Sequence, residues 1–459
     1  MRRIHVDSID KRPQESSEAI ELLGISESFS TRTPNQTPTH DELIAEARKR
    51  ASAEAAAHDP YLALRYGDFR LLVIGRFIVT LGNQALDVAI GWELYARTHS
   101  ALALGFVGLA LFFPVVLLLL PAGQVIDRFD RKLVMQLAQG TMALAAVGLA
   151  VLSYMQGPIP LIYGCLVMFG AASAFGDPAS SAFVPQVIPA EVFNNAATWS
   201  SSAWQLASVI GPALGGFIIA AQGGAGLVYV FDALAALLFV LLLARIKARP
   251  RESASREAVD MRSLTAGVTF IWRTKIILAA ITLDLFAVLL GGATTLLPIF
   301  AQNVLHVGAF GLGVLRAAPS VGAVAMAFLL AHLPPFKRAG RTLLLAVIAF
   351  GVATIIFGLS HSFILSLVML ALLGAFDNIS VVIRNTLMLT RTPDETRGRA
   401  AAVNSMFIGA SNELGGFESG LTAALWGPAA SVVFGGVGTI VVVIAVSLIW
   451  PEMRRLGRL

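Results

Sequence analysis

Three polar residues recur along one apolar stretch near the start of the chain. Arg76, Asn83 and Asp87 lie seven and four residues apart within residues 69–94. In an α-helix, which turns about 100° per residue, these three positions fall within about 40° of one another on one stripe. Because an ionisable group inside a membrane helix is costly, such a stripe predicts a polar cavity rather than a lipid-facing surface.

Three acidic residues inside apolar stretches are candidates for binding a transported proton. Asp87 is the first choice, because withdrawal from water disfavours the charged form of a carboxylate. Asp284 and Asp377 are the other two, within the apolar stretches 275–302 and 363–390. For Asp87, a structural hydrogen bond to a neighbouring helix is the competing interpretation. Asp377 and Arg384 could pair with other helices across the cavity or simply flank the cytoplasmic end.

Further side chains in the apolar stretches are expected to line the same cavity or to contact a substrate. They are Arg76, Asn83, Trp199, Trp204, Gln205, Arg384 and Glu413. For the tryptophans, helix packing or a position at the membrane surface is the competing interpretation. Arg316 is either a counter-ion or a snorkelling charge, and Asp177 and Asp232 are expected near helix ends, in structural roles.

The loop after residues 102–122 contains an ordered pattern of glycine, acidic and basic residues. Its members are Gly123, Asp127, Arg128, Arg131 and Lys132. A carboxylate can cap a helix N-terminus or pair with a cation, and arginines form forked, charge-assisted hydrogen bonds. We therefore expect a latch that holds two halves of the protein together on one face. A basic loop that only sets the orientation in a membrane is the alternative.

A proline among glycines occurs within the apolar stretch 195–221. The residues are Gly211, Pro212, Gly215 and Gly216. Proline removes a backbone donor and kinks a helix, while glycines allow two helices to approach closely. The motif predicts a bending point for a conformational change, a tight packing seam, or both.

The composition excludes several classes of protein. Hydrophobic residues make up 56% of the 459 residues and charged residues only 14%, whereas soluble domains carry about 25% charged residues. An ordinary soluble enzyme and a nucleic-acid-binding module are therefore excluded. The single cysteine, Cys165, excludes an internal disulfide. Because there is no phosphate-binding loop, hydrolase elbow or metal-ligand spacing, we expect no enzymatic activity, no cofactor and no metal.

Twelve apolar stretches are long enough to cross a bilayer, which takes about 20 residues each. They are approximately 69–94, 102–122, 133–154, 160–183, 195–221, 226–246, 275–302, 310–332, 341–359, 363–390, 400–424 and 428–450. Backbone groups in hydrocarbon must be satisfied within each segment, so every stretch is expected to be a helix. The predicted fold class is an all-α membrane protein of twelve transmembrane helices.

Lysine and arginine gather in alternate loops. The basic loops are 127–132, 245–262, 337–341 and 391–399, and the chain end is also basic. The opposite loops contain no Lys or Arg, except for Arg97. The positive-inside rule therefore places both termini in the cytoplasm. The loop 183–195, which is expected on the same side, carries neither Lys nor Arg.

The chain divides into two similar halves. We expect a polar cytoplasmic tail over 1–68, a six-helix half over 69–246, a cytoplasmic linker over 247–274 and a second six-helix half over 275–459. Acidic and glycine positions repeat about 200 residues apart, as in Asp177 with Asp377 and in Gly211 and Gly215 with Gly416 and Gly420. Such a parallel repeat predicts a binding site between the halves, near the membrane midplane.

The order of these motifs resembles the major facilitator superfamily, and within it the drug–proton antiporter branch that includes the enterobactin exporter and macrolide efflux pumps. The similarity covers about residues 61–450. It is carried by the motifs at 123–132 and 211–216, and by residues 69–77, 88–92, 98–105 and 393–399. Asp130 stands where many members have glycine, and Ala207 replaces the leading glycine of the antiporter motif. The resemblance implies twelve helices in two pseudo-symmetric halves, alternating access and proton-driven export.

We therefore predict a secondary active exporter in a bacterial inner membrane. Its expected partners are the lipid bilayer, protons and a small amphipathic substrate such as a drug or a siderophore, with no nucleic acid, and it is expected to act as a monomer. One alternative is a lysophospholipid transporter without strict proton coupling, for which an opening between helices toward the lipid would be evidence. A second alternative is a membrane sensor or scaffold that transports nothing.

Overall fold

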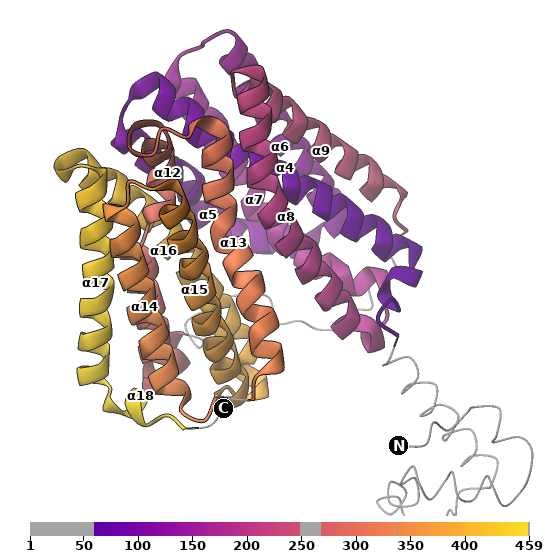
Figure 1. The fold of residues 1–459 in the computed structure, drawn as a ribbon. Coiled ribbons are helices and arrows are strands. Elements are labelled where there is room, and N and C mark those ends of the chain that lie inside the picture. Colours follow the sequence, from indigo (N-terminus) through magenta and orange to yellow (C-terminus); the bar gives the residue numbers. More distant parts are fainter. Residues whose placement is uncertain (1–58, 248–267, 335, 458–459) are drawn as a thin grey trace, which may run out of the picture.

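The structure is a computed structural model that describes residues 59–247, 268–334 and 336–457, and the elements in these ranges are helices, with no strand (Figure 1). The predicted all-α class is thus confirmed. Residues 1–58 of the predicted tail and 248–267 of the predicted linker lie outside the described residues. The first group of long helices is α4 (Gly67–Thr98), α5 (Ala101–Arg128), α6 (Arg131–Tyr154), α7 (Ile159–Val187), α8 (Phe193–Gln222) and α9 (Gly226–Arg245).

The second group begins after the linker. Its helices are α11 (Lys275–Leu290), α12 (Leu297–Ile299), α13 (Gly308–His332), α14 (Ala339–Leu359), α15 (Phe363–Arg391), α16 (Asp394–Trp426), α17 (Pro428–Ile449) and α18 (Pro451–Arg455). Among the described residues, eleven helical segments are long and apolar enough to cross a membrane. The twelfth predicted stretch, 400–424, lies within α16. This helix contains Glu413 and Glu418, which lower its hydropathy, and it packs against α5, α11 and α17.

The helices pack mainly within each group. In the first, α4 contacts α8 and α9, and α6 contacts α7 and α9. In the second, α11 contacts α16 and α17, and α14 contacts α15 and α17. The two groups meet along two equivalent seams, α5 against α16 and α8 against α13. The labelled helices of the two groups stand side by side in Figure 1.

The hydrophobic core shows where the two groups separate. One cluster of buried side chains draws on both groups, from Leu86 and Ile90 of α4 to Leu297 and Phe300. At the other end there are two clusters, one built only from residues 63–246 and one only from residues 271–456. The groups therefore share a core at one end and part at the other, as the diverging α8 and α13 show in Figure 1.

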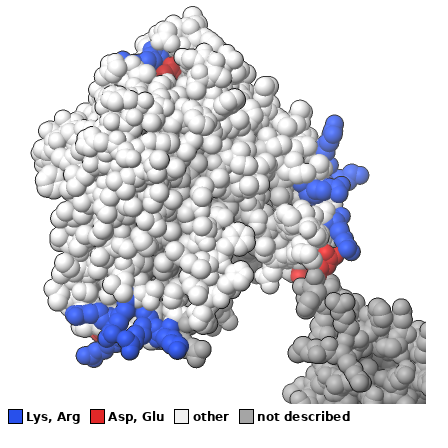
Figure 2. All heavy atoms as spheres, in the orientation of Figure 1, with Lys and Arg blue, Asp and Glu red and all other residues white. Residues whose placement is uncertain are grey.

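The end at which the groups part is the basic end. Here α5, α9 and α15 finish with Arg128, Arg245 and Arg391. Figure 2 shows Lys and Arg gathered in two sets at this end, one beneath each group, with the surface hollowed between them. Arg97, the exception to the predicted charge pattern, lies at the opposite end. Its guanidinium bridges to Glu93 four residues earlier and donates to the Gly157 carbonyl, so its charge is compensated locally.

The predicted helix over 275–302 is not continuous. α11 ends at Leu290, Gly291 and Gly292 follow, and the chain continues through η4 (Ala293–Leu296), α12 and the π-turn η5 (Phe300–Val304). A Cβ on Gly292 would lie 2.4 Å from Ser419 Oγ and 2.7 Å from Gly415 O, so only glycine fits this close approach to α16. Pro298 removes a further backbone donor, and the segment breaks instead of running straight.

Candidate functional site

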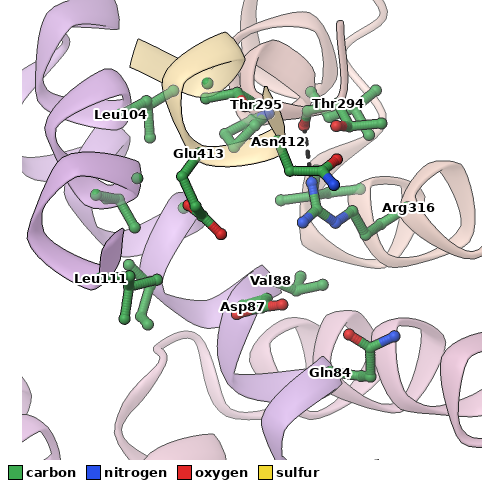
Figure 3. Close-up of a pocket in the computed structure, with 18 of the residues that line it drawn as sticks. Gln84, Asp87, Val88, Leu104, Leu111, Thr294, Thr295, Arg316, Asn412 and Glu413 are labelled. Atoms are coloured by element: carbon green, nitrogen blue, oxygen red, sulfur yellow. Dashed lines mark hydrogen bonds between the residues drawn. The ribbon is translucent and has the colours of Figure 1, made fainter. Parts of the chain in front are cut away.

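The central cavity lies where the two groups meet, next to the shared core. It has a volume of about 520 Å³. α4, α5, α8, α13, α16 and the break after α11 all contribute to its wall, as the close-up in Figure 3 shows for ten labelled residues. The apolar part of the lining comes from Val88, Ile90, Leu104, Val107, Leu111, Leu297 and Leu312. The polar region of the lining is shared by α4, α13, α16 and the break after α11.

A cluster of three charged residues dominates that polar region. Asp87 comes from α4, Arg316 from α13 and Glu413 from α16, and their side chains point toward a common space in Figure 3. Asp87 and Glu413 are close enough to interact electrostatically with each other and with Arg316. In the described part of the chain neither carboxylate forms a salt bridge with Arg316, so both are available to a proton or to a polar substrate group.

Arg316 is held by the broken helix. Its Nη1 donates a hydrogen bond of 3.1 Å to the Thr294 carbonyl, which is drawn as a dashed line in Figure 3. That carbonyl belongs to η4 and also accepts a hydrogen bond from the Leu297 amide. The break therefore supplies the polar partner that keeps a guanidinium inside the cavity. This observation favours the counter-ion interpretation of Arg316 over the snorkelling one.

The predicted cavity residues separate into several places. Asp87, Trp204 and Glu413 line the central cavity, while Arg76 lies beside Trp204 in a small neighbouring pocket. Asn83 does not line the central cavity, and its neighbour Gln84 does. Neighbouring residues of an α-helix point about 100° apart, so a prediction that is wrong by one residue names a side chain on a different face of the helix.

Trp199 and Gln205 lie away from the central cavity. The Trp199 indole donates a 2.8 Å hydrogen bond to the Pro60 carbonyl and stacks against Tyr61, at the basic end of the protein. Its aromatic ring therefore anchors the segment before α4, and substrate contact by Trp199 stays a prediction. Gln205 lines a separate groove between α8 and α13.

A second charged cluster lies inside the later group of helices. Asp284 of α11 forms a buried salt bridge with Arg384 of α15, and Asp377 lies within electrostatic range of both. None of these three residues lines the central cavity. The cluster instead joins α11 to α15 within one group. Asp284, Asp377 and Arg384 therefore lie in the interior of this group of helices and not at the central cavity.

We expect Asp284→Asn to destabilise the protein strongly. Removing Asp284 takes away the salt-bridge partner of the buried Arg384 and leaves it only Asp377 within electrostatic range. Breaking a buried pair in this way costs about 3–5 kcal/mol. Thermal unfolding of the purified protein in detergent measures the loss, and the exposed Glu452→Gln serves as a matched charge-removal control. The double variant Asp284→Asn with Arg384→Leu should recover most of the stability. A melting temperature unchanged by Asp284→Asn would contradict a stabilising role for the pair.

Two of the predicted latch residues, Arg131 and Lys132, make hydrogen bonds within the first group. Arg131 Nη1 donates a 2.7 Å hydrogen bond to the Ala182 carbonyl of α7. Lys132 Nζ donates to the Ala244 and Ile246 carbonyls at the end of α9, at 3.0 and 2.8 Å. These bonds join α6 to α7 and α9 where the two groups are apart. A latch between the groups stays a prediction, for a state in which this end is closed.

The predicted glycine–proline motif forms a packing seam. A Cβ on Gly211 or Gly215 would lie 2.5–2.7 Å from atoms of α4, so these residues bring α8 against α4. Gly216 faces the other group, where a Cβ would lie 2.8 Å from the Gly313 Cα. The motif therefore packs α8 against α4 in its own group and against α13 in the other group, near the end that is closed.

Several residues of the site were not predicted from the sequence. Gln84, Thr294, Thr295 and Asn412 line the central cavity and were not singled out. The adjacent glycines at 291 and 292, followed by Pro298, were a signal that the helix breaks there. Asp232 was expected near a helix end, and the structure places it inside α9, fully buried. Among the described residues no three His, Cys, Asp or Glu side chains are grouped as a metal site.

Comparison with known sequences adds an independent finding. A model of the family described as transmembrane secretion effector matches residues 58–455. The enterobactin exporter EntS of Citrobacter koseri is 29% identical over 392 residues, which cover 84% of this chain and 92% of that protein. The enterobactin exporter EntS of Escherichia coli O1:K1 is 28% identical over the same shares of both chains.

Solved structures show the same fold at lower identity. A bacterial homolog of the human lysosomal transporter Spinster, in an inward-facing and occupied conformation, gives a TM-score of 0.66 at 15% identity, covering 86% of this chain and 97% of that one. A D-xylose–proton symporter also gives 0.66 at 15% identity, covering 85% of this chain and 100% of that one. At these identities the likeness concerns the fold alone.

Proposed function

Because the chain belongs to the transmembrane secretion effector family of the major facilitator superfamily, we propose that it is a secondary active exporter driven by protons. The chain is a multi-pass membrane protein, and the curated relatives reported above are named as exporters. The proposed cargo is a small amphipathic molecule, such as a drug, a siderophore or a similar metabolite.

The charged cluster in the central cavity carries this proposal. Asp87 and Glu413 come from different groups of helices, and Arg316 is close enough to interact with both. A proton bound by either carboxylate changes the net charge between the groups. That change alters the relative free energies of the states in which the cavity opens to one side or the other. Proton binding is in this way coupled to alternating access.

We place the basic end in the cytoplasm of a bacterium, with both termini on that side of the inner membrane. The positive-inside rule supports this orientation, because Lys and Arg gather at this end. The conformation described here is then inward-open, since the groups share a core only at the opposite end. We propose that the chain acts as a monomer in the bilayer, with no enzymatic activity, cofactor or nucleic acid.

The cavity lining supports an amphipathic cargo. The cavity of about 520 Å³ is lined both by apolar side chains, such as Val88 and Leu111, and by polar ones that include the three charged residues. Pockets that bind small molecules combine an apolar lining with a few convergent polar groups in this way. A substrate with an apolar body and one polar or charged group fits this mixed lining.

Inverted membrane vesicles with a fluorescent pH reporter test the proposal. Respiration acidifies the vesicle interior, and a panel of cationic drugs and catecholate siderophores is added from the exposed cytoplasmic face. We expect at least one compound to release protons from vesicles that contain the protein and not from vesicles without it. A panel that gives no protein-dependent release, while the protein is present and folded, would count against proton antiport of these classes.

A groove between α8 and α13 favours a second candidate function, the transport of a lysophospholipid. It has a volume of about 980 Å³. Ser201, Ser202 and Gln205 form a polar strip on α8, whereas Val324 and Phe328 form an apolar strip on α13. The residues lie toward the basic end, where the two groups diverge, and such a groove matches a lipid with one acyl chain.

The two candidates differ in their response to an uncoupler. In proteoliposomes a fluorescent lysophospholipid should cross the bilayer despite the uncoupler if the second candidate is right, and Val324→Trp should slow it by filling the groove. Leu329→Trp is the control, because Leu329 is exposed on α13 outside the groove lining. Lipid movement that is no faster with the protein than without it would exclude this candidate.

A further inference from the structure

Asp232 is a buried carboxylate that the proposed mechanism does not use. It is the seventh residue of α9, well inside a helix of membrane-spanning length. Its exposed fraction is 0%, and neither carboxylate oxygen has a hydrogen-bond partner among the described residues. Removing an ionised carboxylate from water without a partner is very costly, so the group is far more stable as the neutral acid.

Among the described residues, none of the surrounding helices α4, α6 and α8 places a compensating cation beside Asp232. A Cβ on Gly82 would lie 2.6 Å from its Oδ1, so the carboxyl group rests directly on α4. α8 contains no Asp, Glu, Lys or Arg, and the basic residues of α6, Arg131 and Lys132, stand at its first turn. On α4, Glu93 is already engaged by Arg97.

Asp87 is the charged group that acts on Asp232. The two carboxyl groups are close enough to interact electrostatically, although they lie in different surroundings. Asp87 is exposed to the central cavity, while Asp232 is enclosed between α4 and α9. Two like charges at short range raise each other's free energy, so the ionisation of one carboxyl favours the neutral form of the other.

We propose that Asp232 is a second proton-binding site, enclosed behind α4 and coupled to Asp87. The neutral Asp232 allows Asp87 to lose its proton to the cavity, and a protonated Asp87 removes the repulsion that opposes ionisation of Asp232. Its role in transport rests on the proposed proton antiport. The existence of the site does not, because a bound proton can be measured without any substrate.

Proton uptake by the purified protein tests the site directly. The protein, in detergent and weak buffer with a pH indicator, is taken from alkaline pH to just below neutral, and the protons bound per molecule are counted. We expect Asp232→Asn to bind one proton fewer than the wild type near neutral pH and to shift the remaining uptake attributed to Asp87. Asp68→Asn, in the first turn of α4, is the control and should change neither.

The outcomes separate the site from the proposed function. The inference would be overturned if Asp232→Asn bound as many protons as the wild type with the same pH dependence. If this variant does not fold, Asp232→Thr, which is smaller and uncharged, replaces it in the same assay. Asp232→Asn could bind one proton fewer while the wild type shows no antiport with any compound. That pair of results would support the site and reject the proposed transport mechanism.

Discussion

Asp87→Asn is expected to abolish efflux driven by a pH gradient while leaving the protein in the membrane. Asparagine has nearly the same shape as aspartate and cannot carry the proton. Because Asp87 is exposed to the cavity, its replacement should change the free energy of unfolding by no more than about 0.5 kcal/mol. The measurement is compound-dependent proton release from inverted vesicles, with protein amount determined on the same membranes.

The control for this variant is Asp68→Asn on the same helix. Asp68 lies in the first turn of α4 and accepts a hydrogen bond from the Lys247 amide, away from the cavity. It should retain the proton release of the wild type. Undiminished proton release in Asp87→Asn would remove this residue from the mechanism and leave Glu413, on the opposite wall of the cavity, as the carboxylate to test.

Gly216→Val is expected to open the end at which the two groups now share a core. A Cβ here would lie 2.5 Å from the Ala309 carbonyl and 2.8 Å from the Gly313 Cα. Overpacking of this kind costs about 1–3 kcal/mol in the closed arrangement. That energy shifts the balance between conformations by about 5- to 150-fold, and transport should fall because the conformation described here becomes rare.

Thiol accessibility measures the shift. With Cys165, the single cysteine, replaced by serine, Val107→Cys places a reporter in the cavity wall. Gly216→Val should increase its labelling by a membrane-impermeant reagent added outside intact cells. Gly164→Val is the matched control, because a Cβ on Gly164 meets nothing within 4 Å. Equal labelling in both variants would show that the α8–α13 contact does not close this end.

Local patterns were sufficient for the elements and for part of the site. Apolar length and the distribution of Lys and Arg predicted the helices and a basic end, because both depend on residues close together in the chain. Asp87 and Glu413 were identified as charges inside apolar stretches, and the 211–216 motif as a close contact. The structure places Asp87, Glu413 and Gly216 where the two groups of helices meet, whereas Gly211 and Gly215 pack α8 against α4.

Other features depended on contacts between helices that are distant in sequence. Asp284, Asp377 and Arg384 carried the same signal as Asp87, yet they gather inside one group. Trp199 and Trp204 lie five residues apart in α8, but only Trp204 reaches the cavity. Helical periodicity shows which residues share a face and does not show what that face meets.

The sequence by itself determined the fold class, the number and length of the apolar segments and the kinds of charge buried in them. These follow from hydropathy and backbone hydrogen bonding, which act along each segment. Only the tertiary structure decided that α11 breaks beside Arg316, that Asp232 is enclosed against Gly82, and which end of the protein is closed. Each of these depends on how closely two helices approach, and that distance is set by the packing of side chains from the whole bundle.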